Sequence, residues 1–168
     1  MPSTEEELAS LVAASDSVKV VGSGHSFSAI AAPTPSGLLL NLDNYGKLLN
    51  VDLPARRATF EAGVRIRDMH AMLQPHGLAL PTTGAIHTQS YAGAMSTATH
   101  GSTRLYGSYA SLVVGMRIIA ANGTVIECSD VRHPELFRAA KVGLGVVGVI
   151  STVTLQLVEG FYLTKVRI

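Results

Sequence analysis

Cysteine and charge are both scarce in this sequence. Cys128 is the single cysteine, so an internal disulfide and a thiolate metal site are both excluded, and we expect it to be a small core residue. Charged residues make up only 15% of the chain, and the 13 Lys and Arg nearly balance the 12 Asp and Glu. The basic residues are also scattered, which argues against a nucleic-acid partner.

Signals for export or membrane insertion are lacking as well. The N-terminus carries acidic residues within 4–7, where a signal peptide would be basic. The longest uncharged stretch, 142–158, approaches the length of a membrane span, but it contains three glycines and then alternates Thr and Gln with Val and Leu. That pattern predicts a buried turn and strand. We therefore expect a cytoplasmic protein with no membrane segment.

The chain has enough apolar residues for a sizeable core. Hydrophobic residues make up 47% of its 168 positions, which suits one domain or two small lobes that share a core. In the first half, Thr4 is a candidate N-cap with Glu7 as its capping-box partner, and Gly77 ends a second helical pattern. The predicted elements of this half are helices over 4–14 and 64–73 and strands over 18–21, 38–42, 48–51 and 57–62.

The second half alternates strands with a short helix. Asn122-Gly123 is a strong hairpin signal between a predicted strand over 111–120 and another over 124–127. About three helices among many strands, without an internal repeat, place the chain in the α+β class. The remaining predicted elements are a brief helix over 134–141 and strands over 149–158 and 161–168.

A glycine-rich turn follows the first predicted strand. In Gly22-Ser23-Gly24-His25-Ser26, two glycines permit positive φ, and successive backbone N–H groups can converge on a phosphate with serine hydroxyls as further donors. The turn is not a Walker loop, because no Lys-Ser/Thr follows, and Phe27 stands where a dinucleotide fingerprint has its third glycine. A tight turn with a surface histidine is the alternative interpretation.

Two more segments are rich in small residues. Ser90 to Gly101 would let a flat ligand approach the backbone and offers hydroxyl groups, although a close-packed helix and loop has the same composition. Gly143 to Ile150 is equally consistent with a buried strand and a glycine bend. Three such segments in one short chain predict a large planar, phosphorylated cofactor. The other histidines share no ligand spacing, so no metal site is predicted; they are His70, His76, His87 and His133.

These segments resemble the FAD-binding (PCMH-type) domain of the vanillyl-alcohol oxidase family, in particular its alditol oxidases and sugar 1,4-lactone oxidases such as gulonolactone and arabinonolactone oxidases. The similarity is carried by VVGSGHSFS (20–28), RIRDMHAMLQPHGLALPTTG (65–84), SYAGAMSTATHGS (90–102), VVGMRIIAANG (113–123) and PELFRAAKVGLGVVGVISTVTL (134–155). The resemblance implies a two-lobed α+β domain. A small β/α lobe would cover about 1–54, and a larger lobe with an antiparallel sheet and flanking helices about 55–168, with FAD between them.

The resemblance also implies which residues contact FAD. Val20 to Ser26 would be the pyrophosphate loop, and His25 occupies the position at which the family attaches FAD covalently through the flavin 8α-methyl group. His100 would either hydrogen-bond the flavin or order its own loop. Ala85 and His87 depart from the family pattern, because relatives carry more polar or acidic residues there. The implied cofactor-binding residues are Val20, Val21, Gly22, Ser23, Gly24, His25, Ser26, Phe27, Thr83, Gly84, Ser90, Gly93, Thr97, Ala98, Thr99, His100, Gly101, Val149 and Ile150.

For a complete protein, the resemblance implies hydride transfer from a sugar 1,4-lactone or polyol substrate to flavin N5, with oxygen as electron acceptor. It also implies a short segment before the first helix and a substrate-binding domain after Ile168. We therefore expect a fragment that binds FAD with little turnover, and no catalytic residue is assigned in it. The alternative is a non-catalytic flavin- or nucleotide-binding module. A phosphate-binding module unrelated to flavin would leave Ser90 to Ser102 unexplained.

Overall fold

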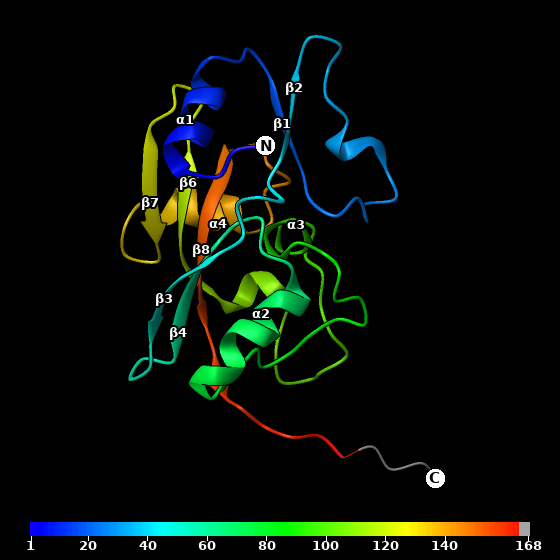
Figure 1. The fold of residues 1–168 in the computed structure, drawn as a ribbon, viewed down its shortest axis with the longest axis vertical. Helices are drawn as coiled ribbons and strands as arrows, with labels where there is room; N and C mark the ends of the chain where they lie inside the picture. Colours follow the sequence, from blue (N-terminus) through cyan, green and yellow to red (C-terminus); the bar gives the residue numbers. More distant parts are fainter. Residues whose placement is uncertain (165–168) are drawn as a thin grey trace.

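The computed structural model describes residues 1–164, in which helices pack around a five-stranded sheet (Figure 1). This mixture confirms the α+β class. No helix within the described residues is both long and apolar enough to cross a bilayer. The helices are α1 (Glu5–Ala13), α2 (Ile66–Leu73), α3 (Tyr91–Ser96) and α4 (Pro134–Lys141); the strands are β1 (Val18–Val21), β2 (Leu38–Asn41), β3 (Leu48–Asp52), β4 (Arg57–Glu61), β5 (Leu78–Ala79), β6 (Val113–Ile119), β7 (Val125–Ser129), β8 (Val149–Gln156) and β9 (Val158–Glu159).

The five-stranded sheet has the order β3-β4-β8-β6-β7, and every neighbouring pair is antiparallel. Its central strand β8 places the fully buried Val153 and Leu155 on one face. Helices α2, α3 and α4 contribute Met69, Met95 and Phe137 to the same hydrophobic cluster. Burial of each such side chain contributes about 1.5–3 kcal/mol. This cluster therefore holds the three helices against the sheet.

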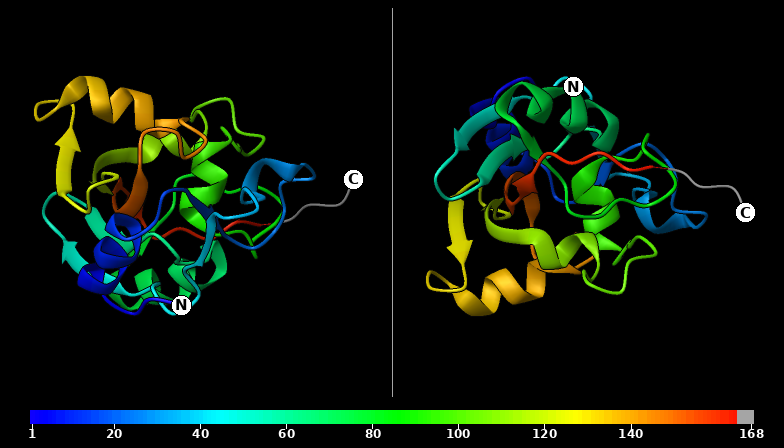
Figure 2. Two further views of the ribbon diagram at one scale, coloured as in Figure 1. Left: turned by 90° about the horizontal axis from the view of Figure 1, so that it is seen from above. Right: turned by 90° about the horizontal axis from the view of Figure 1, so that it is seen from below.

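Helix α1 covers the opposite face at one end of the sheet. Adjacent side chains of a strand point to opposite faces. Ile118 belongs to the cluster with α4, whereas Ile119 belongs to a second cluster with Leu8 and Val12 of α1. Figure 2 agrees with this separation, because α1 and α4 lie on different sides of the strands. The first helix thus joins the sheet to the N-terminal strands.

The start of α1 differs in one detail from the predicted capping box. Thr4 is the N-cap, and its side chain accepts a hydrogen bond from the backbone N–H of Glu7, as predicted. The Glu7 carboxylate, however, accepts from the backbone N–H of Ser3 at 2.8 Å and from the Ser3 hydroxyl, not from Thr4. The backbone hydrogen bond from Ser3 lowers the pKa of Glu7. The reciprocal contact therefore lies one residue earlier than the motif predicts.

The predicted hairpin is present as β6 and β7, whereas the predicted C-terminal strand is not. Gly123, with φ 80°, donates to the carbonyl oxygen of Ala120, so the turn is wider than a two-residue loop. Strand β6 begins only at Val113, after a short 3-10 turn. The prediction of a strand over 161–168 is wrong for Phe161 to Thr164, which form no regular element, because alternation alone supplies no partner strand. Residues 165–168 lie outside the described part.

Strands β1 and β2 form a separate parallel pair, in register from Val18 with Leu38 to Val21 with Asn41. The connection between them carries the glycine turn at the carboxyl end of β1, which is where parallel strands commonly present ligand-binding loops. The predicted lobe boundary near Pro54 falls in the turn between β3 and β4, two paired strands of one sheet. The division into two lobes stays a prediction.

Cys128 gives a direct test of the packing of β7 against the core. Its side chain is 3% exposed, which confirms the predicted core position, and burial raises the pKa of its thiol to about 11. Because the thiolate is the reactive species, we expect Ellman's reagent at about pH 8 to label the native protein at least about 100-fold more slowly than the denatured protein. Equal rates in both states would contradict the buried position.

Candidate functional site

A surface groove lies where β1 and its glycine turn meet α3 and the start of β8. Ala62 and Gly63, which follow β4, also line it. All three small-residue segments singled out in the sequence reach this groove, although they are far apart along the chain. The predicted contact residues that line it are Val20, Val21, Gly22, Ser23, Gly24, His25, Ser26, Ser90, Gly93, Thr97, Val149 and Ile150.

The glycine turn depends on its glycines for two different reasons. Gly24 lines the groove with φ 72°, and a Cβ built on it would have no neighbour within 4 Å, so there is open space beside its backbone. A Cβ on Gly22 would instead collide with the hydroxyl of Ser90, the N-cap residue of α3. The turn therefore packs closely on α3. Phe27 follows with φ 48°, and its side chain is fully exposed and does not line the groove.

A second bend, before β8, also lines the groove. Leu144, Gly145 and Gly148 all have positive φ, at 52°, 77° and 134°. A Cβ on Gly145 would have no neighbour within 4 Å, whereas one on Gly148 would lie 2.7 Å from the carbonyl oxygen of Ile119. Gly148 therefore permits close contact with β6, and Gly145 leaves free space beside the backbone.

Five other predicted residues lie away from the groove, around Tyr109. This buried phenol accepts a hydrogen bond from the Gly84 backbone N–H at 2.6 Å, and the Tyr109 backbone N–H donates to Thr99 at 2.9 Å. Burial raises the pKa of Tyr109. His100 Nδ1 donates to its neighbour's carbonyl at 2.8 Å, which favours the loop-ordering alternative. The residues of this group are Thr83, Gly84, Thr99, His100 and Gly101; Ala98, with φ 56°, precedes them and also does not line the groove.

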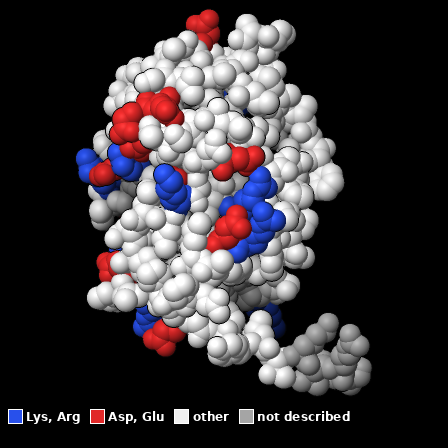
Figure 3. Space-filling model, viewed as in Figure 1, with Lys and Arg blue, Asp and Glu red and all other residues white. Residues whose placement is uncertain are grey.

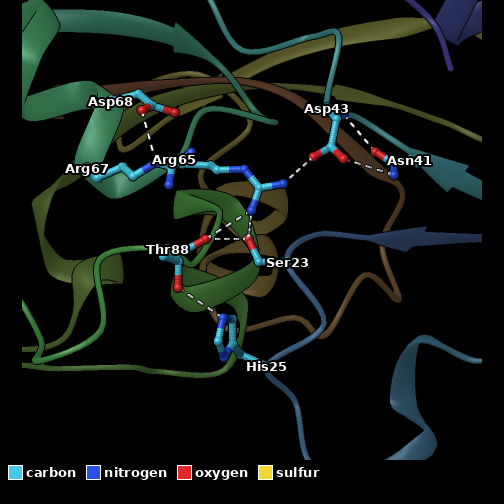
Figure 4. A network of polar contacts seen from close by, with 8 residues as sticks. All are labelled: Ser23, His25, Asn41, Asp43, Arg65, Arg67, Asp68 and Thr88. Carbon is cyan, nitrogen blue, oxygen red and sulfur yellow. Dashed lines mark hydrogen bonds and ion pairs between the residues drawn. The ribbon is translucent and has the colours of Figure 1, made fainter.

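Sequence reasoning missed a polar network at the edge of the groove (Figure 4). The Arg65 guanidinium donates to Asp43 at 2.6 Å, to the Ser23 hydroxyl at 2.8 Å and to the Thr88 carbonyl at 3.2 Å. Ser23 itself donates to the same carbonyl at 2.5 Å, and Thr88 Oγ1 lies 3.1 Å from His25 Nε2. The glycine turn is thus tied both to α2 and to the loop before α3.

The sequence carried one signal for this network. Arg65 is the N-cap residue of α2, a position at which Ser, Thr, Asp or Asn is preferred and a cation is unfavourable next to the helix dipole. Its side chain makes no cap hydrogen bond and reaches instead to the glycine turn. A basic residue that violates the capping preference is therefore a reason to look for a tertiary partner.

A buried polar cluster supports the groove from behind. Ser151 is fully buried, lies 2.9 Å from the Tyr45 hydroxyl and donates to Glu5 at 2.5 Å, and Glu5 also pairs with Arg117. Burial raises the pKa of Tyr45. The backbone carbonyls of Ser151 and Tyr45 accept from Ala62 and Gly63, which line the groove. The cluster therefore fixes the backbone of that wall.

The groove is suited to a long ligand with both a polar and an apolar part. Loop N–H groups and the Ser23 and Ser26 hydroxyls lie at one side, and apolar side chains of Val149 and Ile150 at another. The open faces of Gly24 and Gly145 leave room for atoms of a ligand next to the backbone. On the face drawn in Figure 3, acidic and basic side chains lie next to one another with no broad patch of one sign. These properties fit FAD.

Comparisons with known proteins agree with this interpretation. The family model described as the FAD binding domain matches residues 1–129. The chain is 41% identical over 148 residues to L-gulonolactone oxidase of Bos taurus, covering 88% of this chain and 33% of that protein. It is 36% identical over 168 residues to L-gulono-1,4-lactone dehydrogenase of Mycobacterium tuberculosis, covering 98% of this chain and 38% of that protein.

A solved structure is similar over the same region. The crystal structure of 6-hydroxy-D-nicotine oxidase from Arthrobacter nicotinovorans superimposes with a TM-score of 0.82 at 26% identity, covering 94% of this chain and 35% of the other. The chain therefore spans about a third of the length of the proteins it matches. It belongs to the FAD-binding (PCMH-type) domain family of flavin oxidoreductases, its relatives include the sugar-lactone oxidases, and its cofactor is FAD.

Proposed function

We propose that this chain holds FAD in the groove as part of an oxidase that transfers hydride from a CH–OH group of a sugar 1,4-lactone or polyol to flavin N5, with oxygen as acceptor. The observation that carries the proposal is the convergence of the three small-residue segments on one groove. The substrate class is supported by the similarity to L-gulonolactone oxidase and L-gulono-1,4-lactone dehydrogenase. Bound FAD would supply the hydride-accepting ring.

Each wall of the groove would have its own part in binding. Backbone N–H groups of the turn from Gly22 to Ser26 would face the pyrophosphate, because a concave run of N–H groups stabilises negative charge. Val149 and Ile150 would contact the adenine part through their backbone and apolar surface. Gly93 of α3 and Thr97, the C-cap residue of this helix, would lie beside the flavin, and their small size would let the ring approach the helix.

His25 is the residue that we propose for covalent attachment. It lines the groove immediately after Gly24, the glycine whose face is open. A neutral imidazole nitrogen is a competent nucleophile near neutral pH. Attachment would join that nitrogen to the 8α carbon with loss of one proton from this carbon and one from the second ring nitrogen, and O2 would take up the two electrons and two protons released, giving H2O2.

We also propose that the groups acting on the substrate lie outside this chain. The matched relatives are about three times as long, since the chain covers 33% and 38% of them. The groove is lined by loop backbone and small side chains, which suit contacts with a cofactor. Isolated, the chain should therefore retain FAD and oxidise lactones slowly or not at all.

Acid precipitation tests the attachment. After incubation with FAD and removal of the free cofactor, the purified protein should be yellow, and its colour should stay in the pellet after acid denaturation. His25→Ala should bind FAD but release all of it into the supernatant, because no nucleophile remains at that position. His76→Ala, an exposed histidine outside the groove, is the control and should behave as the parent does.

Each of three outcomes would contradict part of the proposal. Flavin that stays in the pellet of His25→Ala would place the attachment elsewhere. A parent protein that stays colourless with added FAD, although circular dichroism shows it to be folded, would refute binding in the groove by this chain. Flavin that the parent protein releases into the supernatant would be consistent with the proposed FAD site but would contradict the covalent attachment.

A further inference from the structure

Two buried residues behind the groove are close in sequence to residues that line it. Ser151 directly follows Val149 and Ile150, and Tyr45 lies three positions after Leu42. The hydroxyl groups of Ser151 and Tyr45 are 2.9 Å apart, although the two residues are distant in the sequence. Neither residue lines the groove. Any effect that they have on a ligand must therefore pass through their neighbours.

The last acceptor of this hydrogen-bond chain determines its direction. The Ser151 hydroxyl lies 2.5 Å from one carboxylate oxygen of Glu5, and a carboxylate oxygen can only accept. Ser151 has a single hydroxyl proton, so its oxygen accepts from the Tyr45 hydroxyl. Burial raises the pKa of the Tyr45 phenol, which therefore keeps its proton at neutral pH. The chain thus runs from Tyr45 through Ser151 to Glu5.

The backbones of Tyr45 and Ser151 hold one wall of the groove. The Ala62 backbone N–H donates to the carbonyl oxygen of Ser151 at 2.8 Å, and the Gly63 N–H donates to that of Tyr45 at 2.8 Å. The Tyr45 backbone N–H donates in turn to Leu42 at 2.9 Å. Ala62, Gly63 and Leu42 all line the groove. A shift of Tyr45 or Ser151 would therefore move residues that face a ligand.

Helix α1 supplies the end of the chain. Glu5 is the first residue of α1, its side chain is only 14% exposed, and its second carboxylate oxygen pairs with Arg117 of β6. Building on the proposed FAD site, we propose that Glu5, Ser151 and Tyr45 are positioning residues for the cofactor, because the chain they form holds the wall of the groove in the conformation that binds FAD. A wall that is not held must be ordered by the ligand, which lowers the affinity.

The first test is the affinity for FAD in the His25→Ala background, where binding is reversible and can be followed by the quenching of FAD fluorescence. Ser151→Ala, Tyr45→Phe and Glu5→Ala should each weaken binding roughly two- to tenfold, as the loss of one hydrogen bond predicts. Glu5→Gln keeps an oxygen that can accept from Ser151 but loses the charge that pairs with Arg117. It should therefore recover most of the affinity lost in Glu5→Ala.

Thr59→Val is the matched control for a loss of stability alone. It removes the hydrogen bond between the hydroxyls of Thr59 and Thr154, which lie 2.9 Å apart on the paired strands β4 and β8. Neither of these residues lines the groove. Both Thr59→Val and Ser151→Ala should lower the midpoint of urea denaturation, but only Ser151→Ala should weaken FAD binding. A purely structural role of Ser151 would change the stability in both variants and the affinity in neither.

Double variants test whether the three groups act as one chain. Glu5→Ala should have no further effect on the affinity once Ser151 is replaced by alanine, because the chain is then already broken. Independent contributions would multiply instead. Should Ser151→Ala not fold, the combination of Tyr45→Phe with Glu5→Ala makes the same comparison.

Three results would overturn the proposal: an unchanged affinity in both Ser151→Ala and Tyr45→Phe, multiplying effects in the double variant, or an equal loss of affinity in Thr59→Val. If the background protein does not bind FAD, the proposed function fails. Hydrogen exchange of the Gly63 amide in the protein without FAD then decides the role of the chain. Several-fold faster exchange in Ser151→Ala and Tyr45→Phe would support it, and unchanged rates would overturn it.

Discussion

Replacing Gly63 by alanine should lower the free energy of unfolding by about 3–5 kcal/mol. Gly63 follows β4, and a Cβ built on it would run into the carbonyl oxygens of Leu42 and Tyr45, with the Leu42 carbonyl carbon only 2.9 Å away. Both carbonyls accept backbone hydrogen bonds, from Tyr45 and from Gly63 itself. The backbone cannot move aside without breaking these hydrogen bonds, so the added methyl group can be accommodated only with a large loss of stability.

Urea denaturation followed by circular dichroism would measure this change, with Gly115→Ala as the matched control. Gly115 lies within β6, and the nearest atoms to a Cβ built there are 3.8 Å away, which is ordinary contact. We expect that variant to stay within about 0.5 kcal/mol of the parent. If the two variants were equally stable, the close approach at Gly63 would be wrong.

Much of the fold could be predicted because local patterns coincide with the tertiary structure. The predicted strand over 18–21 and helix over 134–141 agree with β1 and α4 to the residue. The hairpin signal at Asn122-Gly123 is independent of the rest of the chain, so it was recognisable in the sequence. The strand prediction for 161–164 was wrong for the opposite reason. Alternating apolar and polar residues are typical of a strand, but a strand needs a partner strand that the local sequence does not specify.

The candidate site was predictable where backbone chemistry defines it. Gly22 and Gly24 predict a turn whose backbone N–H groups can face a ligand, and this turn does line the groove. The contacts of the segment over 83–89 could not be predicted in this way. Thr88 uses its hydroxyl and its backbone carbonyl to contact residues more than twenty positions away in the sequence. Side-chain partners across such separations depend on how α2 and α3 pack, which periodicity does not encode.

Arg65→Met should weaken FAD binding by roughly tenfold. Hydrogen bonds that involve a charged group contribute about 1.5–3 kcal/mol to stability, and the lower end applies here because the Arg65 side chain is partly exposed. The Arg65 side chain is 27% exposed, and its guanidinium donates to Asp43, the Ser23 hydroxyl and the Thr88 carbonyl. Without the guanidinium, the glycine turn loses its hydrogen bonds to the start of α2 and is less ordered in the free protein. FAD binding must then order the turn, and this loss of conformational entropy lowers the affinity.

This effect is best measured in a His25→Ala background, where binding is reversible, by titrating FAD and following the quenching of its fluorescence. Arg67→Met is the matched control, because that side chain is 59% exposed and pairs only with its neighbour Asp68 within the described residues. We expect its affinity to stay within about twofold of the background protein. Equal losses in both variants would assign the effect to net charge alone, whereas a loss confined to Arg65→Met would assign it to the network that holds the glycine turn.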